Sequence, residues 1–159
     1  MYFILKGIIF MEITLRENEK IEDLQCNDLK IIQNKKWFCF GMDAVLLTNF
    51  CDVKNNSSVV DLGTGTGIIP ILLSGKRNIS KAFGVEIQKE VAEMAERSVR
   101  LNNLQDKIEI LNIDLKDVSK YLELNSFDCV ISNPPYKLNN SGIINPNDQK
   151  AISRHEIKC

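Results

Sequence analysis

The feature that most constrains the fold of this chain is a regular alternation that begins at Ser58. Short β-prone runs alternate with helical stretches, in the order SVVDL, GIIPILLSGK, KAFGVEI, KEVAEMAERSVRLNN, KIEILNI, LKDVSKYL and FDCVIS. Strands that alternate with helices form βαβ units, because a parallel strand reaches its neighbour only through a crossover connection. The sequence therefore predicts an α/β fold with a mostly parallel sheet and helices on both faces.

The first 40 residues follow no such pattern. Short β-prone pieces, such as LKIIQN and WFCF, are separated by charged, Asn-rich connectors, which predicts a small hairpin or cap. The opening MYFILKGIIF is apolar and is too short to span a membrane; a signal peptide is the alternative, although a basic start and a cleavage site are lacking. We expect an N-terminal extension and cap over residues 1–40, with Met1 or Met11 as the natural start, and one ligand-binding domain over residues 41–159.

Composition narrows the classes of function. A chain of 159 residues can bury the core of one domain, and its net charge of −1 gives no overall attraction toward a polyanion, so nucleic-acid contacts would need local patches. Five cysteines without a C-x-x-C pair favour a reducing cytoplasm over a disulfide framework. No cluster of residues at metal-ligand spacing occurs in the sequence, so we predict no metal and no membrane partner. The oligomeric state is not determined by these features.

The stretch VVDLGTGTG places Asp61 at a strand end, followed by Gly63, Gly65 and Gly67 and then by a helical run. Glycines let the backbone turn sharply and approach a ligand, and the helix that follows offers free N–H groups. The dinucleotide pattern G-x-G-x-x-G requires a glycine where Ile68 stands, so the match to a pyrophosphate loop is imperfect. The loop instead suits a cofactor without phosphates, with Asp61 favouring a cationic group; a tight strand-to-helix turn is the alternative.

Two further carboxylates end the next two predicted strands. Glu86 closes AFGVEI, at about the 20-residue interval expected for an acid that accepts hydrogen bonds from both ribose hydroxyls; a solvated strand end is the alternative. Asp114 in LNIDL either meets the amino group of an adenine or caps the helix that follows. Because the carboxyl ends of parallel strands meet at one edge of a sheet, these acids and the glycine loop predict a nucleoside site there.

The last predicted strand is followed by NPPY, which opens onto the same edge of the sheet. Proline has a fixed φ and pushes the preceding residue into an extended conformation, so Asn133 and Pro134 should present their carbonyl groups outward. The side-chain oxygen of Asn133 and the backbone oxygen of Pro134 are two acceptors suited to the hydrogens of a planar NH₂ group. Tyr136, after Pro135, offers a flat face for stacking. We predict that this tetrapeptide carries the chemistry; an ordinary rigid turn is the alternative.

In that order, DLGTGTG, VEI and NPPY resemble the S-adenosylmethionine-dependent methyltransferases that modify amino nitrogens, which include N6-adenine methyltransferases and the glutamine methyltransferases of release factors. The stretches LKIIQN, FGMDAVLL, NPPYK and ISRHE are similar, more narrowly, to the bacterial tRNA(Val) adenine-N6-methyltransferase family. The resemblance runs from about Leu15 to the chain end. It implies a Rossmann-like class I methyltransferase fold, S-adenosylmethionine as cofactor and an adenine in tRNA as substrate.

The sheet of that family continues beyond the NPPY strand, whereas only about two dozen residues follow NPPY here. We therefore expect a methyltransferase domain that lacks its last strands, and cofactor binding is better supported than turnover. Two alternatives to tRNA methylation stay open: a release-factor glutamine N5-methyltransferase, since an amide NH₂ fits the same acceptors, and a non-catalytic cofactor- or RNA-binding module. The sequence identifies neither the tRNA nor the base.

Overall fold

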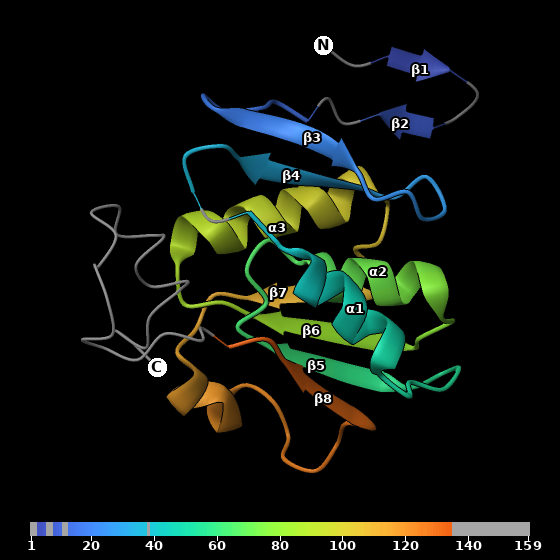
Figure 1. Ribbon diagram of the computed structural model, residues 1–159, viewed down its shortest axis with the longest axis vertical. Helices are drawn as coiled ribbons and strands as arrows, with labels where there is room; N and C mark the ends of the chain where they lie inside the picture. The colour runs from blue at the N-terminus through green and yellow to red at the C-terminus, as the bar shows by residue number, and fades with distance from the viewer. Residues whose placement is uncertain (1–2, 6–7, 11–12, 38, 135–159) are drawn as a thin grey trace.

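The computed structural model describes residues 3–5, 8–10, 13–37 and 39–134 (Figure 1). Two antiparallel pairs come first: β1 (Phe3–Leu5) with β2 (Ile8–Phe10), and β3 (Glu19–Asp23) with β4 (Lys30–Asn34). Helix α1 (Met42–Phe50) follows them and precedes the region of regular alternation. The N-terminal part thus supplies hairpins and one helix, and the main sheet begins after it.

The main sheet has four parallel strands among the described residues, in the spatial order β7-β6-β5-β8. They are β5 (Ser58–Leu62), β6 (Lys81–Val85), β7 (Ile108–Leu111) and β8 (Cys129–Ser132). Helix α2 (Ile68–Lys76), helix α3 (Lys89–Leu101) and the 3₁₀ helix η1 (Leu115–Lys120) provide the three crossovers. The predicted parallel α/β fold is therefore confirmed, and the strand order reverses direction between β5 and β8, where α/β sheets bind ligands.

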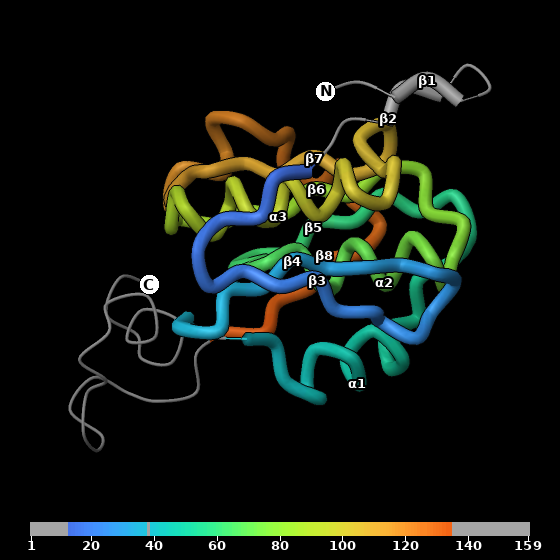
Figure 2. The backbone as a smooth tube through the Cα atoms, turned by 90° about the horizontal axis from the view of Figure 1, so that it is seen from above, coloured from blue at the N-terminus to red at the C-terminus, as the bar shows by residue number. Residues whose placement is uncertain are grey.

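Buried residues lie on both faces of the main sheet, but the two faces are covered differently (Figure 2). On one face, Val59 and Ile131 pack with Ile71 and other residues of α2, and α1 lies on the same side. On the other face, Val60 and Val85 pack with Leu122 and the segment around η1. The sequence predicts a helix at LKDVSKYL, and the structure shows a 3₁₀ helix of six residues there, so the second face has a thinner cover within the described ranges.

The β3–β4 hairpin lies beside α3 (Figure 1), and side chains of α3 and of its C-cap residue bind the edge of the hairpin. Ser98 Oγ accepts a hydrogen bond from the backbone N–H of Ile32 at 3.0 Å. One turn later, Asn102 Oδ1 accepts from the N–H of Lys30 at 2.8 Å, and Asn102 Nδ2 donates to the Lys30 carbonyl at 2.6 Å. The helix therefore satisfies backbone groups that a strand edge would otherwise leave unpaired, and it fixes the hairpin on the domain.

We expect Asn102→Ala to lower the free energy of unfolding by about 1–3 kcal/mol, because it leaves the N–H and C=O groups of Lys30 without their partner. Urea denaturation measures this loss, and hydrogen exchange of the Lys30 amide should accelerate more than that of the strands of the main sheet. Asn102→Asp keeps the acceptor and removes the donor, so its loss should be intermediate. An unchanged exchange rate at Lys30 in Asn102→Ala would contradict this account of the hairpin.

None of the helices in the described ranges has the length and apolar character that crossing a lipid bilayer requires.

Candidate functional site

The register of the main sheet brings the predicted site residues to one edge. Leu62 of β5 pairs with Val85 of β6 and with Ser132 of β8, and Val85 pairs in turn with Leu111 of β7. Each of these four residues ends its strand, so the segments that follow them emerge side by side. Those segments carry the glycine loop, Glu86, Asp114 and Asn133.

The glycine loop runs from the end of β5 into α2 with three left-handed residues, at φ values of 77° for Gly63, 58° for Gly65 and 81° for Gly67. A side chain at such φ values is strained, which explains why glycine stands at each position. A Cβ atom at Gly63 or Gly65 would meet no other atom within 4 Å, whereas Gly67 packs against Ala95. The backbone of Gly63 and Gly65 is therefore open to the close approach of a ligand.

Asp61 is the most unusual group at this edge. Its side chain is 1% exposed, and neither carboxylate oxygen has a hydrogen-bond partner among the described residues. Burial raises the pKa of Asp61 to about 7, the charge of Glu86 adds to this, and the Thr64 hydroxyl acts in the opposite direction without completing a hydrogen bond of normal geometry. A buried carboxylate without a partner is costly, so the arrangement favours a cationic or hydrogen-bond-donating ligand.

Glu86 is 6% exposed, so it is not a solvated strand end. Its Oε2 accepts a hydrogen bond from the N–H of Gly65 at 3.0 Å, and its Oε1 accepts from the N–H of Gln88 at 2.8 Å. Burial raises the pKa of Glu86, and these backbone N–H groups partly oppose that shift. Glu86 therefore holds the glycine loop in place, a role that the sequence analysis did not predict. Each oxygen keeps a second lone pair for a donor from a ligand.

Asp114 and Asn112 follow β7. Asp114 Oδ1 accepts a hydrogen bond from the N–H of Lys116 at 2.9 Å and so caps η1, which is one of its two predicted roles. Contact with an adenine amino group stays a prediction. Asn112 Nδ2 donates to the carbonyl oxygens of Glu86 at 2.8 Å and Ile87 at 3.1 Å. Asn112 was not predicted as a site residue; a polar amide directly after a predicted strand was the only signal for it.

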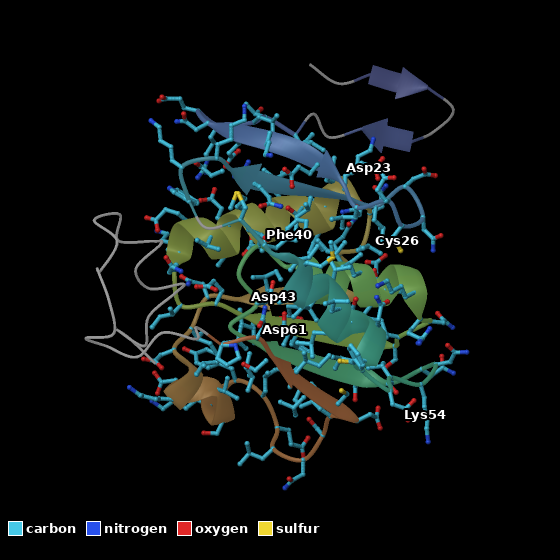
Figure 3. The ribbon with its side chains drawn as sticks, viewed as in Figure 1. Asp23, Cys26, Phe40, Asp43, Lys54 and Asp61 are labelled. Carbon is cyan, nitrogen blue, oxygen red and sulfur yellow. The ribbon has the colours of Figure 1, made fainter. Side chains whose placement is uncertain are left out.

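Asn133 follows β8, and its side-chain Nδ2 donates a hydrogen bond to Asp43 Oδ2 at 2.9 Å. Asp43 lies in the first turn of α1, and Figure 3 shows it at the same end of the sheet as Asp61. Pro134 is exposed next to Asn133. The other two predicted residues of the tetrapeptide, Pro135 and Tyr136, lie outside the described residues. The Asp43 contact joins residues 90 positions apart and was not predicted.

The described part of the chain contains no group of three or more His, Cys, Asp or Glu residues placed to hold a metal ion.

Gly84 of β6 makes room for the glycine loop. A Cβ atom at this position would lie 2.8 Å from Thr64 Cγ2 and 2.9 Å from Ile110 Cδ1. We expect Gly84→Ala to lower the free energy of unfolding by about 1–3 kcal/mol, as overpacked cores do. Urea denaturation measures the loss. Thr64→Ala in the Gly84→Ala background should recover part of it, because it removes the Thr64 atoms that clash and leaves the contact with Ile110; losses that simply add would contradict the proposed contact.

The fold is that of Rossmann-like methyltransferases. M. capricolum TrmK, solved with S-adenosylhomocysteine, superposes with a TM-score of 0.52 at 18% identity over 64% of this chain and 43% of that one. P. horikoshii TYW2, solved with MeSAdo, superposes with a TM-score of 0.53 at 18% identity over 64% of this chain and 38% of that one. The model of the family described as "Methyltransferase small domain" matches residues 40–145, and this chain belongs to that family.

The curated relatives are similar over most of this chain. The tRNA1(Val) (adenine(37)-N6)-methyltransferase of Phocaeicola vulgatus is 33% identical over 115 residues, which are 72% of this chain and 47% of the relative. The enzyme of the same name from Bacteroides thetaiotaomicron is 31% identical over 117 residues, which are 72% of this chain and 47% of that enzyme. The chain thus spans about half the length of the curated relatives that it matches.

Proposed function

We propose that this chain binds S-adenosylmethionine and takes part in N6-methylation of an adenine in tRNA. The observation that carries the proposal is the position of Asp61 on β5 and of Asn133 directly after the neighbouring strand β8, at one edge of the sheet. The first is a buried carboxylate without a partner among the described residues, and the second is the amide of an Asn-Pro segment. The family match and the names of the curated relatives support the same activity.

The residues at this edge fit the proposed cofactor. The ionised carboxylate of Asp61 would attract its cationic end, and the open backbone of Gly63 and Gly65 would let it approach closely. The remaining lone pairs of Glu86 would accept the ribose hydroxyls, and Asp114 would meet the adenine amino group. We place all of these contacts within residues 41–159. When bound, S-adenosylmethionine supplies an electrophilic methyl group.

The amine that accepts the methyl group needs positioning more than it needs a base. The lone pair on N6 of adenine is delocalised into the ring, which makes the amine a poor nucleophile. The Asn133 side-chain oxygen and the Pro134 carbonyl oxygen would bind its two hydrogens and favour a pyramidal nitrogen with an exposed lone pair. These dipoles also stabilise the positive charge that develops on the nitrogen, and the proton is then lost to water. Pro135 would hold the segment rigid, and Tyr136 would stack on the extruded base.

Transfer of tritiated methyl groups from S-adenosylmethionine tests the proposal. The chain is incubated with unmodified tRNA(Val), with unmethylated release factor, and alone. We expect label in the tRNA, and none in a transcript whose adenine 37, the position in the names of the curated relatives, is replaced by guanine. Label in release factor alone would replace the proposal by a glutamine methyltransferase. Cofactor binding without transfer to either would indicate a binding module. A tRNA substrate also implies a cytoplasmic location.

A further inference from the structure

The hydrogen bond between Asp43 and Asn133 determines which end of the Asn133 amide points away from α1. An Asn side chain has an acceptor end and a donor end of nearly the same shape. An ionised carboxylate is only an acceptor, so it can bind the NH₂ end and not the oxygen. Asn133 Nδ2 lies 2.9 Å from Asp43 Oδ2. The side-chain oxygen of Asn133 is therefore turned away from Asp43.

Asp43 is itself held in place by the start of α1. It is the second residue of the helix, near the free N–H groups and the positive end of the helix dipole. Gly41 precedes the helix, and a Cβ atom on it would lie 2.5 Å from Asp43 Oδ1. Gly41 has φ −102° and ψ 180°, a conformation that residues other than glycine also adopt. The missing side chain at position 41 thus provides space for the carboxylate and is not required by the backbone.

Helix α1 is fixed in turn to the body of the domain. Its residues Ala44 and Thr48 are buried at 2% and 1% exposure. Lys76, at the end of α2, donates hydrogen bonds to Thr48 Oγ1 at 2.9 Å and to Asn49 Oδ1 at 2.7 Å. The position of Asp43 relative to the strand ends is therefore set by packing on α2, and Asn133 receives a partner with a defined place.

We propose that Asp43 is a positioning residue for methyl transfer: it orients the Asn133 amide so that the oxygen of Asn133, and not its NH₂ group, faces the amino group of the methyl acceptor. This inference rests on the proposed function. With the amide reversed, two NH₂ groups would oppose each other, and the site would favour a carbonyl group over an amine. Asp43 would thus determine that the site accepts an NH₂ donor, although it does not touch the substrate.

Nuclear magnetic resonance tests the contact without any substrate. The side-chain ¹⁵N–H signals of Asn133 are assigned by their loss in Asn133→Ala. In Asp43→Asn, which keeps the shape and removes the charge, we expect these signals to shift. In Asp52→Asn, an exposed acid just beyond α1, they should stay in place. Asn133 signals that are identical in the wild type and in Asp43→Asn would overturn the inference.

Kinetics test the consequence. In Asp43→Ala we expect kcat for tRNA to fall roughly 10- to 100-fold, the range expected when a catalytic group is misplaced, with the Kd for S-adenosylmethionine unchanged. In Asp43→Asn the fall should be smaller, because the amide oxygen can still accept from the Asn133 NH₂ group. Asp52→Asn should behave as the wild type. A role of Asp43 in helix stability alone would lower Tm and leave kcat unchanged at temperatures where the variant is folded, and that result would overturn the inference.

A double-mutant cycle with Gly41 makes the test specific. Gly41→Ala should displace the flexible end of Asp43 at little cost in Tm and lower kcat, because its Cβ would lie 2.5 Å from Asp43 Oδ1, which is closer than the two atoms can approach. In an Asp43→Ala background the same change should have no further effect. If the fold losses in kcat caused by Gly41→Ala and Asp43→Ala multiply in the double variant, the inference is overturned. If the wild type transfers no methyl group to RNA, the proposed function fails, and the Asn133 resonances alone decide whether Asp43 orients the amide.

Discussion

Asn133→Ala is expected to lower methyl transfer to tRNA by roughly 10²- to 10³-fold, the loss typical of removing one preorganised polar group from an active site. Truncation removes the side-chain oxygen that would hold one hydrogen of the acceptor amine, and it also leaves Asp43 without its partner. The Kd for S-adenosylmethionine should stay nearly unchanged, because Asn133 follows β8, whereas Asp61 lies on β5, the glycine loop follows β5 and Glu86 follows β6. Single-turnover transfer and equilibrium cofactor binding measure the two quantities separately.

The matched control is Asn55→Ala. It removes the same amide from an exposed turn before β5, at the opposite end of the sheet, where the residue accepts one long hydrogen bond of 3.3 Å from the N–H of Asn78. We expect transfer by this variant to equal that of the wild type. Turnover in Asn133→Ala at the wild-type level would rule out the proposed binding of the acceptor amine by the Asn133 and Pro134 oxygens. A parallel loss of cofactor affinity would move Asn133 from the acceptor side of the site to the cofactor side.

Sequence patterns predicted the parts of this site that depend on neighbours along the chain. The alternation of β-prone and helical runs predicted the parallel sheet, since each element is specified by its own periodicity. The glycines of VVDLGTGTG predicted a sharp backbone turn, and in the structure Gly63, Gly65 and Gly67 have positive φ values. The acids at strand ends were brought to one edge by the topology of a parallel sheet alone.

The contacts that the sequence did not predict join distant segments. Asp43 and Asn133 are 90 residues apart, and the side chains of Ser98 and Asn102 bind β4 across more than 60 residues. Such pairs depend on how elements pack, and no local spacing encodes them. The helix predicted at LKDVSKYL is a 3₁₀ helix of six residues. The sequence did not indicate which type of helix forms, because six residues are too few to distinguish a period of 3.6 from a period of 3. The hydrogen bond between Glu86 and the N–H of Gly65 is likewise not encoded by local spacing, because it exists only once β5 and β6 are paired.

Asp61→Asn is expected to stabilise the ligand-free protein at pH 8 and to weaken its affinity for S-adenosylmethionine. The pKa of Asp61 rises from 3.8 to about 7 in the folded chain, because the carboxyl group is buried. Between these two values the folded state binds more protons than the unfolded state, so this residue makes stability fall as pH rises from about 4 to 7. Above pH 7 the full penalty applies, and at about 1.4 kcal/mol per pKa unit it amounts to a few kcal/mol.

Asparagine does not ionise, so the variant escapes this penalty, although its buried amide still lacks partners and the net gain is smaller. Urea denaturation between pH 5 and pH 8 should show a difference between wild type and Asp61→Asn that grows with pH. The exposed Asp52→Asn gives the control, because its curve should run parallel to that of the wild type. Parallel curves for Asp61→Asn as well would show that Asp61 is not an unpartnered buried carboxylate.

Cofactor affinity should show the opposite dependence on pH. Only the ionised carboxylate attracts a cationic group, so binding of S-adenosylmethionine by the wild type should weaken as pH falls below about 7. Binding by Asp61→Asn should be weak at every pH. Isothermal titration at several pH values measures both, and a wild-type affinity that does not change with pH would contradict the proposed role. A partner that binds the ionised form lowers the pKa of Asp61, so the cofactor should stabilise the wild type most at high pH, where the unoccupied site destabilises the fold most.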